Sequence, residues 1–262
     1  MTKVVYISTD GMRPDAIAAA HTPNLRAIMG RGAYTLTGCS VMPSISLPCH
    51  MSIFHSVPPE RHGILVNTYT PMARPVPGLV EVVNDAGKRC ASFISWEPLR
   101  DLSRPGRLSV STLIAYARNP EVADDLTVNA AIPYLRSGEF DFIFLYLATV
   151  DEVGHDFGWM SDRYLRQVER SDAHLGLILE NLADDTAVVV HSDHGGHDRS
   201  HGTDSAEDMT IPWMAAGPGI KENFAIERQV GLLDTAPTIT RMLGVDPSPL
   251  WEGRAVEEIF TA

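Results

Sequence analysis

The chain has 262 residues, of which 44% are apolar and 21% charged, as is ordinary for a globular protein. Its formal net charge is −12 and it has no lysine- or arginine-rich stretch, which argues against binding to polymeric DNA or RNA but is compatible with a small phosphorylated substrate. The three cysteines have no metal-like spacing and are expected to be reduced thiols. No signal peptide opens the sequence, and no apolar run reaches the roughly 18 residues of a membrane span. We therefore expect a cytoplasmic protein without a membrane partner, and the sequence leaves its oligomeric state open.

Short apolar runs alternate with longer amphipathic segments along the chain. In chain order we expect a strand at Lys3–Ser8, a helical stretch over Arg13–Arg31 broken at Pro23, a helix at Ser46–Ser56, a strand at Arg89–Ser95, a helix at Ala123–Ser137, a strand at Phe140–Thr149, a helix at Ser161–Leu182, strands at Thr186–His191 and Thr210–Ala215, and a helix at Leu232–Leu243. Strands that are apolar on both faces and alternate with helices predict an α/β fold, with a largely parallel central sheet covered by helices on both faces. The stretches Thr68–Gly78 and Trp96–Arg107 are expected to be surface loops, so we predict one domain over residues 1–262.

Three of the predicted strands run into an aspartate: Asp10, Asp151 and Asp193. In a parallel sheet these carboxylates lie along the carboxyl-terminal edge, where α/β proteins bind their ligands. A single aspartate in such a position usually caps the next helix. Three of them, two with a histidine one or four positions away, are poorly explained by capping.

Histidines accompany the second and third of these aspartates. His155 follows Asp151 by four residues, on the same side of a helical turn, and His194 directly follows Asp193. A glycine-rich loop then carries His197 and His201. Mixed carboxylate and imidazole ligands favour zinc over magnesium, and six of them exceed one tetrahedral site, so two metal ions are implied. Two divalent ions against three aspartates leave about one positive charge, which suits a phosphate anion.

A candidate nucleophile stands at the start of the predicted helix Ser46–Ser56, which has Pro48 in its first turn. The hydroxyl of Ser46 would lie beside free backbone N–H groups and the positive end of the helix dipole, an arrangement that holds phosphate. From this segment alone, a plain helix N-cap is the competing interpretation.

Together these motifs resemble the alkaline phosphatase superfamily, and within it the type I phosphodiesterase/nucleotide pyrophosphatase branch, which includes phosphonoacetate hydrolase. The resemblance extends from Val4 to about Ile220 and implies an alkaline-phosphatase-like three-layer sandwich. The motifs that carry it, in order, are Asp10–Arg13, Ser46–His50, His62–Asn67, Asp151 with His155, Asp193–Gly195 and His201–Gly202.

The resemblance also implies a role for each matched residue. Asp10, Asp193 and His194 would hold the ion that also contacts the nucleophile oxygen of Ser46. Asp151, His155 and His201 would hold the ion that activates the attacking water. Asn67, together with the backbone N–H after the nucleophile, would hold a non-bridging phosphoryl oxygen. The expected cofactors are two divalent metal ions, with zinc preferred and manganese as the alternative.

The sequence departs from the family pattern in three places. Ser46 replaces the threonine that is usual in this branch, which preserves the hydroxyl chemistry. His50 stands where sulfatases carry the arginine of their signature, which counts against a sulfatase. Only seven residues separate Asp193 from His201, so a cap at that point is absent and the pocket is expected to be small and open.

Some residues keep two interpretations. His197 competes with His201 as the last ligand, and His201 is favoured because glycine follows it, as in the family motif. Tyr69, Trp96 and Trp159 could stack on a substrate or pack in the core. His50 and His191 are expected to be buried behind the ligands or hydrogen-bonded.

The predicted function is hydrolysis of phosphate esters, of the phosphodiester or nucleotide pyrophosphate type, through a phosphoserine on Ser46. No motif supplies an arginine for a doubly charged phosphate, which favours diesters. A phosphomonoesterase or phosphonate hydrolase with the same site is the alternative. A non-catalytic metal or phosphate binder is disfavoured because all seven positions, the six ligands and Ser46, are retained.

Overall fold

A single mixed sheet forms the centre of the protein in the computed structural model, which describes residues 2–115 and 122–261. The strand order of this eight-stranded sheet is β4-β3-β5-β1-β6-β7-β2-β8. The strands are β1 (Lys3–Thr9), β2 (Gly32–Cys39), β3 (Cys90–Ile94), β4 (Val110–Leu113), β5 (Phe142–Leu147), β6 (Thr186–His191), β7 (Thr210–Ala216) and β8 (Phe224–Ala225). β7 pairs antiparallel with β6 and β2, while the other strand pairs are parallel. The predicted α/β fold with a largely parallel sheet is therefore confirmed.

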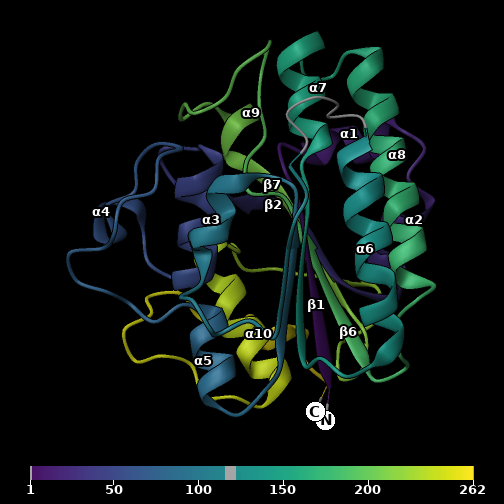
Figure 1. Cartoon of the computed structure of the whole chain (residues 1–262). Helices are drawn as coiled ribbons and strands as arrows, with labels where there is room; N and C mark the ends of the chain where they lie inside the picture. Colours follow the sequence, from purple (N-terminus) through teal and green to yellow (C-terminus); the bar gives the residue numbers. More distant parts are fainter. Residues whose placement is uncertain (1, 116–121, 262) are drawn as a thin grey trace.

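Helices cover both faces of this sheet (Figure 1). On one side lie α3 (Ser46–His55), α5 (Leu79–Asp85) and α10 (Thr235–Leu243), and on the other lie α1 (Pro14–Ala19), α2 (Pro23–Arg31), α6 (Ala123–Ser137) and α8 (Asp162–Leu179). Two short helices, α7 (Thr149–Phe157) and α9 (Ala206–Met209), lie at the top of the view, and α4 (Pro59–His62) lies at the left. The described ranges also contain the 3₁₀ turns η1 (Glu97–Leu102), η3 (Leu232–Asp234) and η4 (Glu257–Ile259). None of the helices in the described ranges combines the length and the apolar character that crossing a membrane requires.

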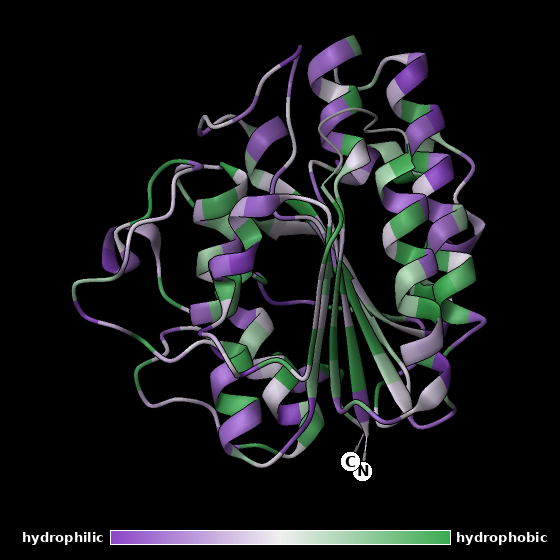
Figure 2. Ribbon diagram, in the orientation of Figure 1, coloured by the Kyte–Doolittle hydropathy of each residue, from purple (hydrophilic) through white to green (hydrophobic). Residues whose placement is uncertain are grey.

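The central strands bury both of their faces because both are apolar. Along β1, Val4 and Tyr6 pack into one core, while Val5 and Ile7 pack into the other. Alternation of side chains along a strand explains this division. Figure 2 shows the same pattern, with hydrophobic strands in the middle and hydrophilic residues on the outer faces of the helices. The two cores hold the strands rigid, so their carboxyl ends form a fixed edge.

The predicted strand at Phe140–Thr149 extends too far at its carboxyl end. β5 ends at Leu147, and Thr149 already begins α7. The buried carboxylate of Asp124 accepts hydrogen bonds from the backbone N–H groups of Ala148 and Thr149, at 2.9 and 3.3 Å. These bonds satisfy free donors at the start of α7 and let a helix begin directly at the sheet edge.

Several other elements differ from the sequence-based expectations. The strands β2, β4 and β8 and the helix α5 were not predicted, the predicted loop Trp96–Arg107 contains the 3₁₀ turn η1, and the predicted helix Leu232–Leu243 is divided into η3 and α10. The remaining predicted elements occur within a few residues of their expected bounds.

Candidate metal centre and nucleophile

The three predicted aspartates meet at the carboxyl-terminal edge of the sheet. Asp10 directly follows β1, Asp193 follows β6 by two residues, and Asp151 is the third residue of α7, which follows β5. Because β1 pairs with both β5 and β6, the three chain segments lie side by side. All three residues are buried, with exposed fractions of 1%, 0% and 8% for Asp10, Asp193 and Asp151. Figure 1 shows this edge at the top of the sheet, below α7 and α9.

The first group of candidate ligands surrounds the ring of His194. Its Nε2 lies 3.2 Å from Oδ1 of Asp10 and 3.4 Å from Oδ2 of Asp193. The hydroxyl oxygen of Ser46 is 3.2 Å from the same nitrogen. The residues predicted for the first metal and the predicted nucleophile are therefore in contact with one another.

The second group contains Asp151, His155 and His201, whose ligand atoms lie within 4.8 Å of one another. Nε2 of His201 is 3.1 Å from Nε2 of His155 and 3.6 Å from Oδ1 of Asp151. The ring of His201 stacks on that of His194 with 3.8 Å between the ring centroids. The two groups thus form one continuous centre.

The imidazoles are oriented so that one nitrogen of each faces this centre. Nδ1 of His194 donates to the carbonyl oxygen of Gly195 at 2.8 Å, and Nδ1 of His201 donates to that of Ser44 at 2.8 Å. Nδ1 of His155 donates in the same way to the carbonyl oxygen of Arg199, at 3.0 Å. With the proton on Nδ1, each Nε2 has a free lone pair, as a metal ligand needs.

The carboxylates present free oxygens to the same space. Asp10 Oδ1, Asp151 Oδ1 and Asp193 Oδ2 are buried and have no hydrogen-bond partner among the described residues. Burial raises the pKa of Asp151 and of Asp193 well above the usual range, and the negative charge of Asp10 raises both further. Unpartnered buried carboxylate oxygens that repel one another are costly without a cation. Three carboxylates and three imidazoles therefore fit divalent ions of the zinc type.

Ser46 is the first residue of α3, and the N-cap position belongs to Ile45, which makes no side-chain cap. The simple N-cap interpretation of Ser46 is therefore wrong for this structure. The residue is 5% exposed, and the ring of His50 contacts its carbonyl oxygen from the next turn, with Nδ1 at 2.8 Å. The hydroxyl is thus held at the helix start and directed toward His194 rather than toward its own helix.

His197 lies apart from the two ligand groups. Its Nδ1 is 2.7 Å from Oδ1 of Asp208, and its side chain is 37% exposed. His201, not His197, is the histidine that the structure brings together with Asp151 and His155.

The side chain of Asn67 lies next to the start of α3, as the predicted role requires. Its Oδ1 accepts a hydrogen bond of 3.0 Å from the backbone N–H of Leu47, the residue after Ser46. The side chain itself is exposed. The amide and the N–H that were predicted to share a phosphoryl oxygen are therefore adjacent and contact each other.

The three aromatic residues proposed to stack on a substrate lie in different surroundings. Trp159 is only 7% exposed; its Nε1 donates to the carbonyl oxygen of Gly11 at 2.9 Å, and its ring meets that of His155 edge-on, with centroids 5.1 Å apart. Trp96 packs against the core. Tyr69 is 38% exposed and lines a hollow of about 410 Å³ with Met51. Burial thus favours the packing alternative for the two tryptophans.

Tyr146 is the residue of this centre that the sequence analysis missed. Its hydroxyl donates to Oδ2 of Asp10. It belongs to the apolar run of β5, which resembles a core strand throughout, so nothing in a single sequence distinguishes it from neighbouring core aromatics. His50, which was expected behind the ligands, lies there: its Nδ1 is 3.4 Å from Oδ2 of Asp193.

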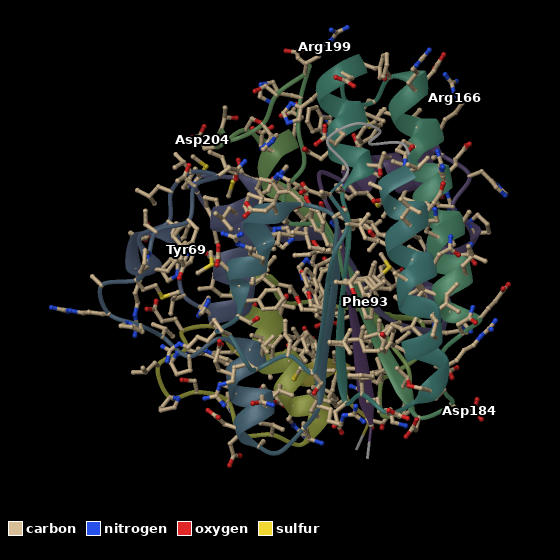
Figure 3. All side chains as sticks on the ribbon, viewed as in Figure 1. Tyr69, Phe93, Arg166, Asp184, Arg199 and Asp204 are labelled. Atoms are coloured by element: carbon tan, nitrogen blue, oxygen red, sulfur yellow. The ribbon has the colours of Figure 1, made fainter. Side chains whose placement is uncertain are left out.

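Three arginines lie near the motifs in the sequence, Arg13, Arg100 and Arg199, and none of them points into the centre. Arg13 is engaged with Asp15 and with the carbonyl oxygen of Gly196, and Arg100 is engaged with Glu97 and Asp101. Figure 3 shows Arg199 at the outer end of its loop, pointing away from the protein.

Comparison with known proteins gives two family matches. Residues 105–247 match the family model of the metalloenzyme superfamily. Residues 4–86 match the family model of type I phosphodiesterases/nucleotide pyrophosphatases. A murine GPI ethanolamine phosphate transferase 3 catalytic subunit is 26% identical over 193 residues, which make up 70% of this chain but 17% of that protein. The chain therefore spans less than a fifth of the length of this relative.

Solved structures share the fold. Murine ectonucleotide pyrophosphatase/phosphodiesterase 5, as an inactive threonine-to-alanine variant with AMP, superposes with a TM-score of 0.84 over 100% of both chains, at 17% identity. A 2-O GAG sulfatase superposes with a TM-score of 0.82 over 98% of this chain and 73% of its own, at 15% identity. The metalloenzyme match extends over more than half of the residues, so the chain belongs to the metalloenzyme superfamily. Its predicted resemblance to the alkaline phosphatase superfamily is confirmed.

Proposed function

We propose that this protein is a two-metal hydrolase of phosphodiesters or nucleotide-type pyrophosphates that acts through a phosphoserine on Ser46. One observation carries the proposal: the hydroxyl of Ser46, at the start of a helix, lies 3.2 Å from the buried His194, in a centre of three buried carboxylates and three imidazoles that opens to solvent at the exposed His155. The type I phosphodiesterase match over residues 4–86, which includes Ser46, supports it.

The six ligand residues divide into two sets in this proposal. Asp10, Asp193 and His194 would hold one ion near Ser46. The set of Asp151, His155 and His201 would hold the other. When bound, the two ions would supply the positive charge that favours an ionised serine and stabilises the developing negative charge of the reaction.

The protein's own groups would then carry out a double displacement. Ser46 Oγ would attack phosphorus, forming an Oγ–phosphorus bond while the ester oxygen leaves on the opposite side. Water would hydrolyse the phosphoserine and restore the hydroxyl. The variant of the murine structural neighbour that is described as inactive replaces a threonine with alanine, which supports an essential hydroxyl in this fold.

Asn67 and the N–H of Leu47 would hold a non-bridging oxygen of the phosphoryl group. In the structure, Oδ1 of Asn67 occupies this N–H at 3.0 Å. Bound substrate would replace that contact, and rotation of the amide would direct its NH₂ group to the same phosphoryl oxygen. A neutral donor pair of this kind adds no charge to the centre.

The charge balance supports a diester rather than a monoester. A monoester carries close to two negative charges near neutral pH, and enzymes for such substrates commonly add a forked arginine contact. Here the guanidinium of Arg13 is occupied by Asp15 and by the carbonyl oxygen of Gly196. The complex of the murine neighbour with AMP supports a nucleotide-like substrate class.

A kinetic comparison on metal-defined enzyme tests the proposal. Bis-p-nitrophenyl phosphate, p-nitrophenyl phosphate and the p-nitrophenyl ester of thymidine monophosphate would be compared by kcat/KM after chelation and reloading with zinc or manganese. We expect the two diesters to exceed the monoester, and chelation to abolish activity. Full activity in protein shown by metal analysis to contain no ions would refute the mechanism, and a preference for the monoester would make the protein a phosphatase.

A further inference from the structure

In two of the aspartates at the centre, one carboxylate oxygen is already engaged by the protein. Oδ1 of Asp193 accepts the backbone N–H of Gly11 at 3.3 Å, and Oδ2 of Asp10 accepts the hydroxyl of Tyr146. The other oxygen of each, Asp193 Oδ2 and Asp10 Oδ1, is buried and has no hydrogen-bond partner among the described residues. These free oxygens lie 3.4 and 3.2 Å from Nε2 of His194. The protein therefore determines which oxygen of each carboxylate faces the candidate metal.

For Asp10 this choice depends on a side chain rather than on the backbone. Tyr146 lies on β5, directly opposite Ser8 in the parallel pairing with β1, and is 2% exposed. Its ring meets the ring of His50 edge-on, with 5.3 Å between centroids and 77° between planes. His50 is itself fixed, with Nε2 3.0 Å from the hydroxyl of Ser8 and Nδ1 2.8 Å from the carbonyl oxygen of Ser46. Packing on a fully buried and hydrogen-bonded histidine holds the phenol ring in place.

We propose that Tyr146 is a positioning residue that fixes the rotation of the Asp10 carboxylate, so that Oδ1 alone faces the first metal. The inference rests on the proposed two-metal function and deepens it, because it assigns a determinant of affinity to one of the two metals. The hydrogen bond restricts the carboxylate to the orientation in which Oδ1 is near His194. Hydrogen bonds that orient a metal ligand typically contribute about 10–100-fold to metal affinity.

The inference makes the two metals unequal. Asp10 lies with His194 and Ser46 and does not belong to the group of Asp151, His155 and His201, although Asp151 is close enough to Asp10 and His194 to join either group. Loss of the Tyr146 hydroxyl should therefore lower the affinity for one metal ion and leave the affinity for the other nearly unchanged. A purely structural role for the tyrosine would instead affect overall stability, or both metals alike.

The test is zinc titration of metal-free full-length protein, with a competing chromophoric chelator, in the wild type and in Tyr146→Phe. We expect two zinc ions in both proteins, with one of them bound about 10–100-fold more weakly in the variant. Tyr6→Phe is the matched control. Tyr6 is fully buried in the same core, its ring is 5.1 Å from that of Phe144, and its hydroxyl has no hydrogen-bond partner among the described residues.

A second variant keeps the result interpretable if Tyr146→Phe lowers stability. In an Asp10→Asn background the carboxylate is gone, so adding Tyr146→Phe should cause no further loss of affinity for the remaining metal. If wild type and Tyr146→Phe bind both ions with equal affinity, or if the variant loses affinity for both ions alike, the inference is overturned. The proposed function is not affected by either result. A wild type that binds fewer than two zinc ions would overturn both.

Discussion

The hydroxyl oxygen of Ser46 lies 3.2 Å from Nε2 of His194, although the two residues are 148 positions apart in the chain. Burial alone would lower the pKa of His194, but the nearby carboxylates of Asp193 and Asp10 raise it well above its usual range. This balance shows how strongly negative the surroundings of the hydroxyl are. A serine in such surroundings ionises only if positive charge is supplied, which is the physical reason for expecting metal ions here.

Replacing Ser46 with alanine tests the covalent route. We expect kcat for an aryl diester to fall by several orders of magnitude, on the order of 10³–10⁶-fold, because a whole reaction path is removed. Metal content should stay at two ions, since the six ligand side chains remain. Ser52→Ala is the matched control: this serine is buried in the same helix, with its hydroxyl 3.1 Å from Nε2 of His62, and its loss should leave kcat within a fewfold. Near-native turnover of Ser46→Ala would exclude the phosphoserine.

The choice between His201 and His197 can be decided by metal analysis. His201 is grouped with Asp151 and His155, so His201→Ala should lose one of two zinc ions and most activity. His197 pairs with Asp208 at 2.7 Å, so His197→Ala should retain both ions. Metal content of the dialysed variants, measured by atomic emission, is the readout. Retention of two ions by His201→Ala together with loss of one by His197→Ala would reverse the assignment.

Much of the sheet edge could be predicted because buried parallel strands have a strong signature. The run Phe142–Leu147 is apolar or aromatic at every position, and Thr186–His191 has four apolar residues between its polar ends. An aspartate that follows such a buried strand is therefore expected at the edge of the sheet. The strand β2 escaped prediction because its residues, Gly32–Cys39, include two glycines and two threonines and form no continuous apolar run. Its pairing with β7 depends on long-range contacts that local pattern does not specify.

The surroundings of the ligands were harder to predict than the ligands themselves. Trp159 fits beside Gly154 and Gly196, where a Cβ would come within 2.7 and 2.2 Å of its ring. Such a fit requires three segments to be placed together, and no spacing along the chain indicates it. Tyr146 likewise belongs by pattern to an ordinary buried strand, and only the register with β1 places it next to Asp10.

The pairing of His197 with Asp208 predicts a pH-dependent contribution to stability. The hydrogen bond to Asp208 raises the pKa of His197 above its ordinary value. Burial alone would raise the pKa of Asp208, but hydrogen bonds from His197 and Thr203 lower it. A raised histidine pKa stabilises the fold below the unfolded value of about 6.5, and this contribution is lost as pH rises through the folded pKa. A lowered aspartate pKa stabilises the fold above the unfolded value of about 3.9 and is lost as pH falls through the folded pKa.

The expected outcome is a difference in Tm between wild type and His197→Ala that is largest between about pH 4 and 6.5 and shrinks above neutrality. Thermal unfolding of metal-free protein over this range measures it, and other titrating groups cancel in the comparison. His21→Ala is the control, since His21 is exposed and its loss should give only a small difference. A difference that grows with rising pH would contradict the pairing.

The last prediction concerns Asn67, whose side chain reaches the N–H of Leu47 at 3.0 Å. If this amide and N–H hold a phosphoryl oxygen, Asn67→Ala should lose about 2–4 kcal/mol of transition-state stabilisation, seen as a fall in kcat/KM for an aryl diester. The loss should appear mainly in kcat, because the interaction strengthens as charge develops on the oxygen. Asn84→Ala is the control, because its amide contacts the carbonyl oxygen of Lys88 and the side chain of Arg107 at the far end of α5. A variant of Asn67 with unchanged kcat and raised KM would mean that the amide holds substrate and transition state equally. The oxygen would then depend for its stabilisation on the backbone N–H and the metal ions.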